Sequence, residues 1–165
     1  MSFAPLSYYT ADDLKAIRKA ETFEALCTIA LEIVARMPPR VGIVCGPITT
    51  GGAGNLEMNL AQFTKAIVRL SCCGANVFTQ LPYESAMQRI KQNPTYFKGG
   101  NQLLEAIFRP LFSSPQVHTL YFLPDWESSR GARWEHEEAI RIGLTRRYLR
   151  PNFAQIPFDE SILIE

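Results

Sequence analysis

Apolar residues along the chain recur with two different spacings, and these spacings predict alternating helices and strands. Helical spacing runs through residues 11–36, 55–73, 84–91, 101–111 and 130–149. Short apolar runs, most of them rich in β-branched or aromatic residues, predict strands at 40–45, 75–79, 117–123 and 152–157. Strands that alternate with helices favour a parallel sheet covered by helices on both faces.

Several of the predicted boundaries carry capping residues. Thr10 precedes the first helix and has an acidic residue three positions on, which is a variant of the capping box. The Pro-Pro pair in residues 37–39 ends that helix. Asn55 caps the next one, and Gly74 closes it. The order strand, loop, helix, strand over residues 40–79 predicts a βαβ unit with a right-handed crossover.

Together these elements predict an α/β fold, flavodoxin-like or Rossmann-like, with a doubly wound parallel sheet and an additional N-terminal helix. We expect residues 1–39 to form a helical extension and residues 40–165 to form the α/β domain. Residues 161–165 are apolar for a chain end, and we expect this tail to dock on another part of the protein.

Composition narrows the classes of partner. The 165 residues suggest one domain, with 47% hydrophobic and 20% charged residues. A net charge of +1 gives no strong field for a nucleic acid or an anionic membrane. No apolar run approaches the roughly 18 residues that span a bilayer, and the N-terminus does not resemble a secretory signal. We therefore expect a cytoplasmic protein without nucleic-acid or membrane partners.

The cysteines do not suggest a metal site. Cys27, Cys45, Cys72 and Cys73 contain no CxxC pair, and no histidine lies near them in the sequence. Cys27, Cys72 and Cys73 fall in helical apolar patterns, so we expect buried thiols there. We expect neither a metal nor a cofactor.

Two glycine-bearing loops follow two of the predicted strands. The first contains Gly46, Gly51 and Gly52, and the second contains Ser129 and Gly131 at the start of a helix. In a doubly wound sheet both loops lie at the same edge, where backbone N–H groups and helix N-termini can bind an anion. Neither loop is a Walker A loop or a GxGxxG fingerprint, so ATP hydrolysis and NAD chemistry are disfavoured.

One acidic residue lies about a turn into the helix after the second loop. Glu135 shares a helical stripe with Ala139 and Ile142, and these small and apolar neighbours favour a side chain that points inward. The alternative is an ordinary surface glutamate, because nearby i,i+4 charge pairs indicate a solvated face.

The two loops also carry a family resemblance. Residues 44–52 (Val-Cys-Gly-Pro-Ile-Thr-Thr-Gly-Gly) and 129–135 (Ser-Arg-Gly-Ala-Arg-Trp-Glu) resemble two motifs of the nucleoside 2-deoxyribosyltransferase superfamily and its nucleotide N-glycosidase relatives. The resemblance covers roughly residues 41–143. It implies an enzyme that cleaves or transfers at the N-glycosidic bond of a nucleoside or nucleoside 5′-monophosphate, and it implies a homo-oligomer, for which the N-terminal helix and the tail are plausible interface elements.

The resemblance assigns roles to individual residues. Glu135 would be the nucleophile, and Ser129 matches the phosphate-binding serine of the monophosphate branch. Gly51 and Gly52 would line the same pocket. Asp125 could protonate or position the base or orient Glu135, and its alternative role is to cap the turn before the helix.

The chain departs from the family pattern at two positions. Ile43 stands where relatives often have a tyrosine, and His118 stands where many have an aspartate. These changes could mean an altered substrate, replacement by Tyr83 or Tyr121, or lost catalysis. A nucleotide-binding module without turnover is therefore the alternative function.

Other residues near the motif have simpler interpretations. Trp126 and Trp134 could stack on a base, but packing in the core or at an interface is favoured. His136 follows Glu135 directly, so it points about 100° away along the helix and is expected at the surface. We expect Glu138 and His118 to be structural.

Overall fold

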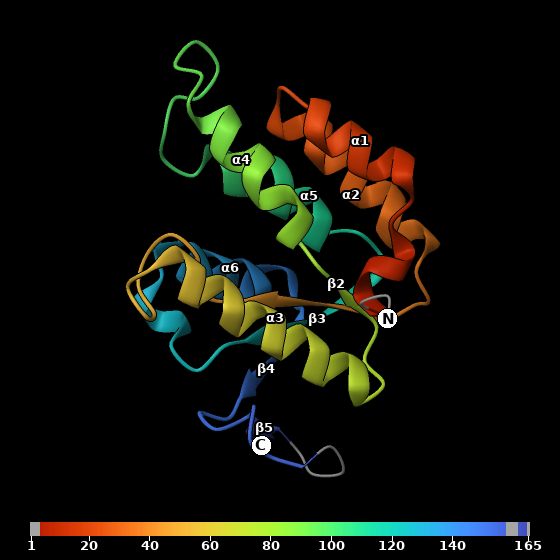
Figure 1. The fold of residues 1–165 in the computed structure, drawn as a ribbon, viewed down its shortest axis with the longest axis vertical. Helices are drawn as coiled ribbons and strands as arrows, with labels where there is room; N and C mark the ends of the chain where they lie inside the picture. The colour runs from red at the N-terminus through yellow and green to blue at the C-terminus, as the bar shows by residue number, and fades with distance from the viewer. Residues whose placement is uncertain (1–3, 158–161, 165) are drawn as a thin grey trace.

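The computed structural model describes residues 4–157 and 162–164, and one mixed sheet organises this part of the chain (Figure 1). The strands follow the order β2-β1-β3-β4-β5, in which β1 to β4 are parallel and β5 runs antiparallel to β4. Their bounds are β1 Val41–Cys45, β2 Val77–Phe78, β3 Val117–Phe122, β4 Thr145–Leu149 and β5 Leu163–Ile164. The prediction of an α/β fold with a mainly parallel sheet is confirmed.

Helices surround this sheet, and several of them begin where the sequence predicts. Thr10 forms a full capping box with Asp13, and Asn55 accepts a hydrogen bond from Met58 N. Figure 1 shows α1, α2, α4 and α5 gathered at one end of the molecule. The helices are α1 Ala11–Lys19, α2 Phe23–Arg36, α3 Leu56–Cys72, α4 Glu84–Lys91, α5 Arg109–Phe112 and α6 Arg130–Ile142, with a π-helical segment at Leu104–Phe108 and short 3₁₀ turns at Ala4–Tyr8, Leu81–Tyr83 and Trp126–Ser128.

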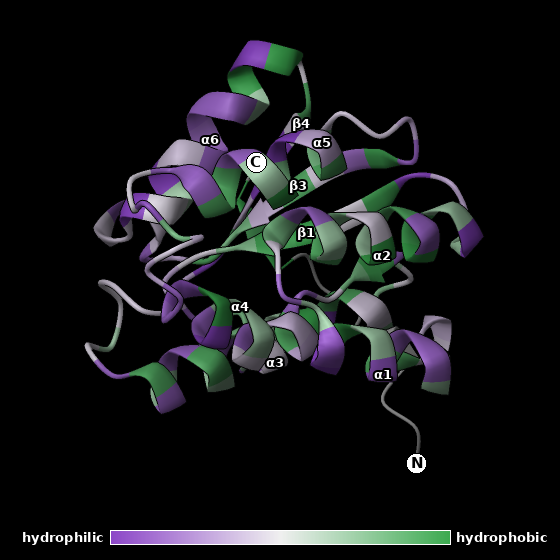
Figure 2. Ribbon diagram, turned by 90° about the horizontal axis from the view of Figure 1, so that it is seen from above, coloured by the Kyte–Doolittle hydropathy of each residue, from purple (hydrophilic) through white to green (hydrophobic). Residues whose placement is uncertain are grey.

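The central strand β1 is buried on both faces, as expected for a strand inside a parallel sheet. Ile43 and Cys45 pack into a cluster with α2, α4 and α5, whereas Val44 packs against α3 on the opposite face. Side chains along a strand alternate between faces, so three consecutive apolar residues serve two separate cores. In Figure 2, β1 and β3 are largely green in the interior, and purple is concentrated on the helices around them.

The predicted N-terminal helix over residues 11–36 is two helices. Ala20 has extended backbone angles after α1, and the Thr22 side chain accepts a hydrogen bond from Ala25 N to cap α2. The spacing of apolar residues continues across the break, which is why it resembles one helix. The hydrogen bond from Ala25 N to the Thr22 side chain replaces a backbone hydrogen bond that one continuous helix would need, so α1 ends and α2 begins.

The end of the motif helix and the fourth strand were also predicted wrongly. Helix α6 ends at Ile142 because Gly143 adopts a left-handed conformation with φ +78, so residues 143–149 do not continue it. Thr145–Leu149 instead forms β4 between β3 and β5. Residues 152–157 are turns and not the fourth strand, and their apolar side chains Phe153 and Ile156 are buried against α3.

The remaining predictions about burial have mixed outcomes. Within the tail, Ile162 is buried and Leu163 and Ile164 pair with β4, whereas 161 and 165 lie outside the described residues. Cys27 is buried as predicted, but Cys72 and Cys73 are exposed, because Cys72 is the last residue of α3 and Cys73 is its C-cap, beyond the last buried residue of the helix, Leu70. Among the residues described, no helix is long and apolar enough to cross a membrane.

The N-terminal segment contributes to the main core. Ile17 from α1 and Leu26 and Ile33 from α2 belong to the same buried cluster as Phe78 and Leu120 of the sheet. The division of the chain at residue 40 stays a prediction, but the two parts share apolar packing and are not separated by a linker.

Candidate active site

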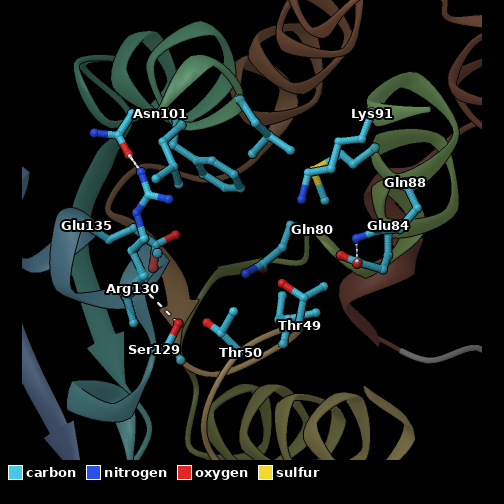
Figure 3. A pocket seen from close by; sticks show the side chains of 18 of the residues that line it. Thr49, Thr50, Gln80, Glu84, Gln88, Lys91, Asn101, Ser129, Arg130 and Glu135 are labelled. Atoms are coloured by element: carbon cyan, nitrogen blue, oxygen red, sulfur yellow. Dashed lines mark hydrogen bonds between the residues drawn. The ribbon is translucent and has the colours of Figure 1, made fainter. Parts of the chain in front are cut away.

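A cavity of about 340 Å³ opens at the carboxyl ends of β1, β2 and β3, the edge at which open α/β sheets bind ligands (Figure 3). One side, which we call the α6 wall, is formed by the start of α6, and the loop after β1 lies below the cavity in Figure 3. The opposite side, the α4 wall, is formed by α4. The polar lining residues are Ser129, Arg130 and Glu135 on the α6 wall with Asn101 beside Arg130, Glu84, Gln88 and Lys91 on the α4 wall, Gln80 between the walls, and Thr49 and Thr50 in the loop after β1.

The two glycine-bearing loops meet, as the sequence predicted. Gly52 N donates a 2.7 Å hydrogen bond to Ser128 Oγ. A Cβ at Gly51 would lie 2.3 Å from the backbone oxygen of Ser128, and the φ of Gly51 is +72. Only glycine therefore allows this approach. Gly51 and Gly52 thus form the contact between the two loops. Contrary to our prediction, neither of them lines the cavity.

A residue that sequence reasoning missed holds the first loop in shape. Asn59 on α3 is 3% exposed, and its Nδ2 donates to Ile48 O at 2.9 Å and to Gly51 O at 3.2 Å. Its Oδ1 accepts from Ala53 N at 2.9 Å. The signal in the sequence is a polar residue one turn before Phe63 on the apolar face of a helix. The buried Asn59 amide therefore supplies the hydrogen bonds that three backbone groups of the loop would otherwise make with water.

The second loop sets the start of α6. Ser129 is 4% exposed, and its Oγ caps the helix by accepting a 3.3 Å hydrogen bond from Ala132 N. Arg130 and Gly131 follow at the cavity wall, and the Arg130 guanidinium donates to Asn101 Oδ1 at 3.1 Å. The helix N-terminus and this guanidinium together give the α6 wall a positive potential.

Glu135 lies in the α6 wall one turn further along the helix. The side chain is 7% exposed, and burial raises the pKa of its carboxyl group to about 8. Its hydrogen-bonding partner is the thiol of Cys45 at the end of β1, which opposes this rise but does not cancel it. Burial and the neighbouring Glu135 in turn raise the pKa of the Cys45 thiol well above its usual value. The free protein therefore carries a mainly protonated Glu135 at neutral pH.

The polar side of α4 also faces the cavity, which we did not predict. Glu84, Gln88 and Lys91 recur at the i, i+4 and i+7 positions that share a helix face. Gln88 Nε2 donates a 2.9 Å hydrogen bond to Glu84 Oε1. The spacing was visible in the sequence, but nothing in it said that this face looks toward Glu135.

Of the seven residues predicted for the site, the structure brings four into the cavity wall. These are Gly46, Ser129, Gly131 and Glu135. Asp125 is exposed and does not line the cavity, and its backbone oxygen accepts a hydrogen bond from Ser128 Oγ at 2.7 Å. Asp125 stands at the N-cap position of the 3₁₀ turn, but its side chain makes no capping hydrogen bond, so the structure supports neither the capping role nor a role beside Glu135.

The aromatic residues of the motif pack in the protein. Trp126 stacks on His136 with ring centroids 4.2 Å apart, and His136 Nε2 lies 2.7 Å from the Tyr148 hydroxyl. The expected surface position of His136 is therefore wrong: it is half-buried because β4 places Tyr148 beside it. Trp134 packs under the guanidinium of Arg109 at 5.4 Å. None of these rings lines the cavity.

The positions that depart from the family pattern also lie away from the cavity. Ile43 is fully buried in the core, and His118 contacts Arg40 and Thr119 as a structural residue. Tyr83 and Tyr121 do not line the cavity either, so neither supplies a hydroxyl group to Glu135.

Within residues 4–157 and 162–164, no three His, Cys, Asp or Glu side chains are grouped to hold a metal ion. The cavity instead combines one buried carboxyl group, two cationic side chains and a helix N-terminus. Comparison with protein-family models, with curated proteins and with solved structures finds no match to this chain.

Proposed function

We propose that this protein cleaves or transfers at the N-glycosidic bond of a nucleoside or nucleoside 5′-monophosphate, with Glu135 as the nucleophile. The observation that carries the proposal is the position of Glu135: it is buried in the wall of a cavity at the carboxyl edge of the sheet, where the two predicted loops meet. The resemblance of residues 44–52 and 129–135 to the deoxyribosyltransferase superfamily adds the reaction type. The strand order 2-1-3-4-5 supports the flavodoxin-like topology that goes with it.

In the proposed reaction a carboxylate oxygen of Glu135 attacks the anomeric carbon of the sugar. The bond from that carbon to the base nitrogen breaks, and the base leaves with the bonding electrons and takes up a proton. Water, or a nitrogen of a second base, then attacks the same carbon and frees Glu135. A negative carboxylate next to the sugar stabilises the oxocarbenium-like transition state of both steps.

The α6 wall is suited to the 5′-phosphate of such a substrate. Backbone N–H groups at the start of α6 and the Arg130 guanidinium lie on the same side of the cavity as Glu135. Helix N-termini and guanidinium groups are preferred phosphate ligands in proteins. The Ser129 hydroxyl already caps the helix, so its expected role in phosphate binding requires it to share this interaction.

The test is a panel of nucleosides and 5′-monophosphates incubated with the protein, with free base measured by chromatography. We expect base release from at least one member, and we expect Glu135→Ala to abolish it. Glu138→Gln on the same helix is the matched control, because Glu138 does not line the cavity, and it should retain release. Release that survives in Glu135→Ala would remove the proposed nucleophile.

The protonation state of Glu135 favours a second candidate function. A carboxyl group with a pKa of about 8 is protonated at neutral pH, where it donates a hydrogen bond to a ligand and does not attack it. The candidate is a nucleotide-binding or sensor module without turnover. Tight binding of a nucleoside monophosphate with no base release at any pH between 6 and 9 would favour this module over the enzyme.

We also propose that the protein forms a homo-oligomer, as the family resemblance implies. Support comes from exposed apolar side chains near the two chain ends, Leu6 and Ile164, and on α3, Leu56 and Met58. Light scattering coupled to size exclusion should give a mass above 18.6 kDa, and a mass equal to one chain would overturn this proposal.

A further inference from the structure

The chain after α4 runs along the rim of the cavity. We call residues 92–101 the strap. It begins directly after Lys91 on the α4 wall and brings Asn101 beside Arg130 on the α6 wall, so its ends lie on opposite sides of the cavity (Figure 3). Three residues of the strap line the cavity, and they are Phe97, Gly100 and Asn101. A ligand in the cavity is therefore bordered by the strap as well as by the two walls.

The part of the strap nearer α4 is anchored to α2. The Tyr96 hydroxyl accepts a 2.9 Å hydrogen bond from Phe23 N and donates one to Glu24. The ring of Phe23 contacts the rings of Tyr96 and Phe97, with centroids 5.4 and 5.9 Å apart. Phe23 is fully buried, so this part of the strap is held by the core of the protein.

The other end of the strap is held to α6 by one exposed hydrogen bond. Arg130 Nη2 donates to Asn101 Oδ1 at 3.1 Å, and among the residues described no other hydrogen bond joins the strap to α6. Gln102 ties the strap only to itself, because its side chain accepts from Lys98 N and donates to Tyr96 O. Arg130 is exposed, and water competes for exposed side-chain pairs of this kind. The hydrogen bond to α6 is therefore weak and opens easily.

Two glycines lie between the anchored part and this hydrogen bond. Gly99 and Gly100 have φ of +86 and +62, and a Cβ at either position would meet no atom beyond its chain neighbours within 4 Å. The left-handed backbone, and not a lack of space, therefore calls for glycine here. Glycine also leaves the backbone free to change its torsions, as the hinge of a moving loop does. The strap thus combines an anchored part, a flexible turn and a weakly held end.

Arg130 is shared between this hydrogen bond and the anion site of the α6 wall. A guanidinium group carries five N–H donors, and Asn101 uses one of them, so others remain for a phosphate group. An exposed arginine gives up side-chain freedom to hold Asn101, whereas an arginine that a phosphate already fixes has lost this freedom beforehand. A bound anion therefore strengthens the hydrogen bond to Asn101, and this hydrogen bond strengthens anion binding to the same extent.

We propose that the strap is a lid on the cavity, that the hydrogen bond from Arg130 to Asn101 is its latch, and that an anionic group bound at Arg130 keeps it closed. A closed lid shields the bound ligand from bulk water. The inference rests on the proposed function for the presence of a phosphate group at the α6 wall, but it concerns binding and does not require turnover.

Trypsin reports the opening of the strap, because Lys98 is an exposed residue within it. The rate of cleavage after Lys98 is measured by mass spectrometry without ligand, with inorganic phosphate, and with each 5′-monophosphate of the panel above. Cleavage of a loop follows the fraction of time that the loop is open. We expect at least one of these anions to slow cleavage of the native chain about threefold or more. Cleavage after Lys65 within α3 requires unfolding of that helix, so its rate shows whether a variant has lost global stability.

Substitutions on both sides of the latch test its role. Asn101→Ala removes the acceptor, so cleavage after Lys98 should be about threefold faster than in the native chain, and an anion should no longer slow it. Arg130→Ala removes the latch and the anion site and should behave alike. The double variant should be cleaved no faster than either single variant, because both substitutions remove one interaction. Asn152→Ala, at an exposed turn outside the cavity, is the matched control and should behave as the native chain does.

The outcomes separate this inference from the proposed function. Cleavage that is no faster in Asn101→Ala than in the native chain overturns the inference. Slowing by an anion that persists in Asn101→Ala overturns it as well, because the anion then shields Lys98 without the latch. Slowing of the native chain without base release keeps the inference and removes the proposed enzyme. Base release together with cleavage that no anion changes keeps the enzyme and removes the inference, whereas neither release nor slowing overturns both.

Discussion

Two glutamates on α6, one turn apart, are both buried and yet differ in protonation. Glu135 faces the cavity, where no cation pairs with it among the described residues, and burial raises its pKa to about 8. Glu138 is 4% exposed and pairs with Arg109 at 3.1 Å and Arg141 at 2.5 Å. The hydrogen bond from Arg141 is the largest cause of the lowered pKa of Glu138, and Arg109 adds to it.

The difference teaches that burial alone does not decide the charge of a carboxyl group. Desolvation disfavours the charged form of both residues, and two guanidinium groups reverse this at Glu138 only. A carboxyl group that remains buried without a cation lowers stability once it is ionised, and proteins keep such groups mostly at functional sites. Glu138 ties α6 to α5, whereas Glu135 is available to a ligand.

The largest expected effect is on stability as a function of pH. Glu135 has a folded-state pKa above its unfolded value, so the native protein loses stability as the pH rises from about 4.5 to about 8. Glu135→Gln removes this loss. We expect the variant to gain about 4 kcal/mol in the free energy of unfolding, relative to the native chain, between pH 5 and pH 9. Urea denaturation at both pH values measures it. A constant difference would show that the pKa is not raised.

The second effect is on rate. If the ionised form of Glu135 is the nucleophile, kcat/KM for base release should rise with pH and level off above about pH 8, because only then is the carboxyl group ionised in the free protein. The ionised fraction increases about tenfold between pH 7 and pH 9. A profile that falls above pH 8 would instead make Glu135 a proton donor.

The third effect is the contribution of Glu138 to stability, which should be lost at low pH and not, as with Glu135, at high pH. Glu138 has a folded-state pKa below its unfolded value, so its contribution to stability is present above the unfolded pKa and is lost as the pH falls through the folded one. Glu138→Gln should cost about 1 kcal/mol at pH 7, since it weakens hydrogen bonds to guanidinium groups that are half-exposed. Denaturation at pH 7 and pH 4 tests this, and a larger cost at pH 4 would contradict it.

The smallest effect concerns Cys45. Its hydrogen bond lowers the pKa of Glu135, so Cys45→Ala should move the rising limb of the kcat/KM profile to higher pH, whereas Cys45→Ser retains a donor and should restore it. Cys27→Ala, at a buried thiol away from Glu135, is the control. If the rising limb of the profile keeps its pH in Cys45→Ala, the Cys45 thiol does not lower the pKa of Glu135.

Local signals predicted much of the framework. The Thr10 and Asn55 caps, the bounds of α4 and the positions of β1 and β3 follow from residue types within a few positions of each other. The burial of Glu135 was also predictable, because Ala139 and Ile142 share its stripe. In each case residues that are close in the sequence determine the feature, and the tertiary contacts do not override it.

Other features depend on contacts between distant segments. Thr145–Leu149 has a polar, basic sequence that suggests a helix surface, and it is a strand because β3 and β5 offer their backbone groups on either side. In the same way, no pattern near Glu84 indicates that its helix would face Glu135 across the cavity.

The sequence by itself determined the alternation of strands and helices, the two glycine-bearing loops and the inward side of α6, because these follow from spacing and capping within short stretches. The tertiary structure alone decided which polar groups meet. Among the residues described, it left Glu135 without a paired cation, gave Glu138 two, and placed Glu84 across the same cavity from Glu135. The protonation state and hydrogen-bonding needs of a side chain depend on groups that are brought near it from far along the chain.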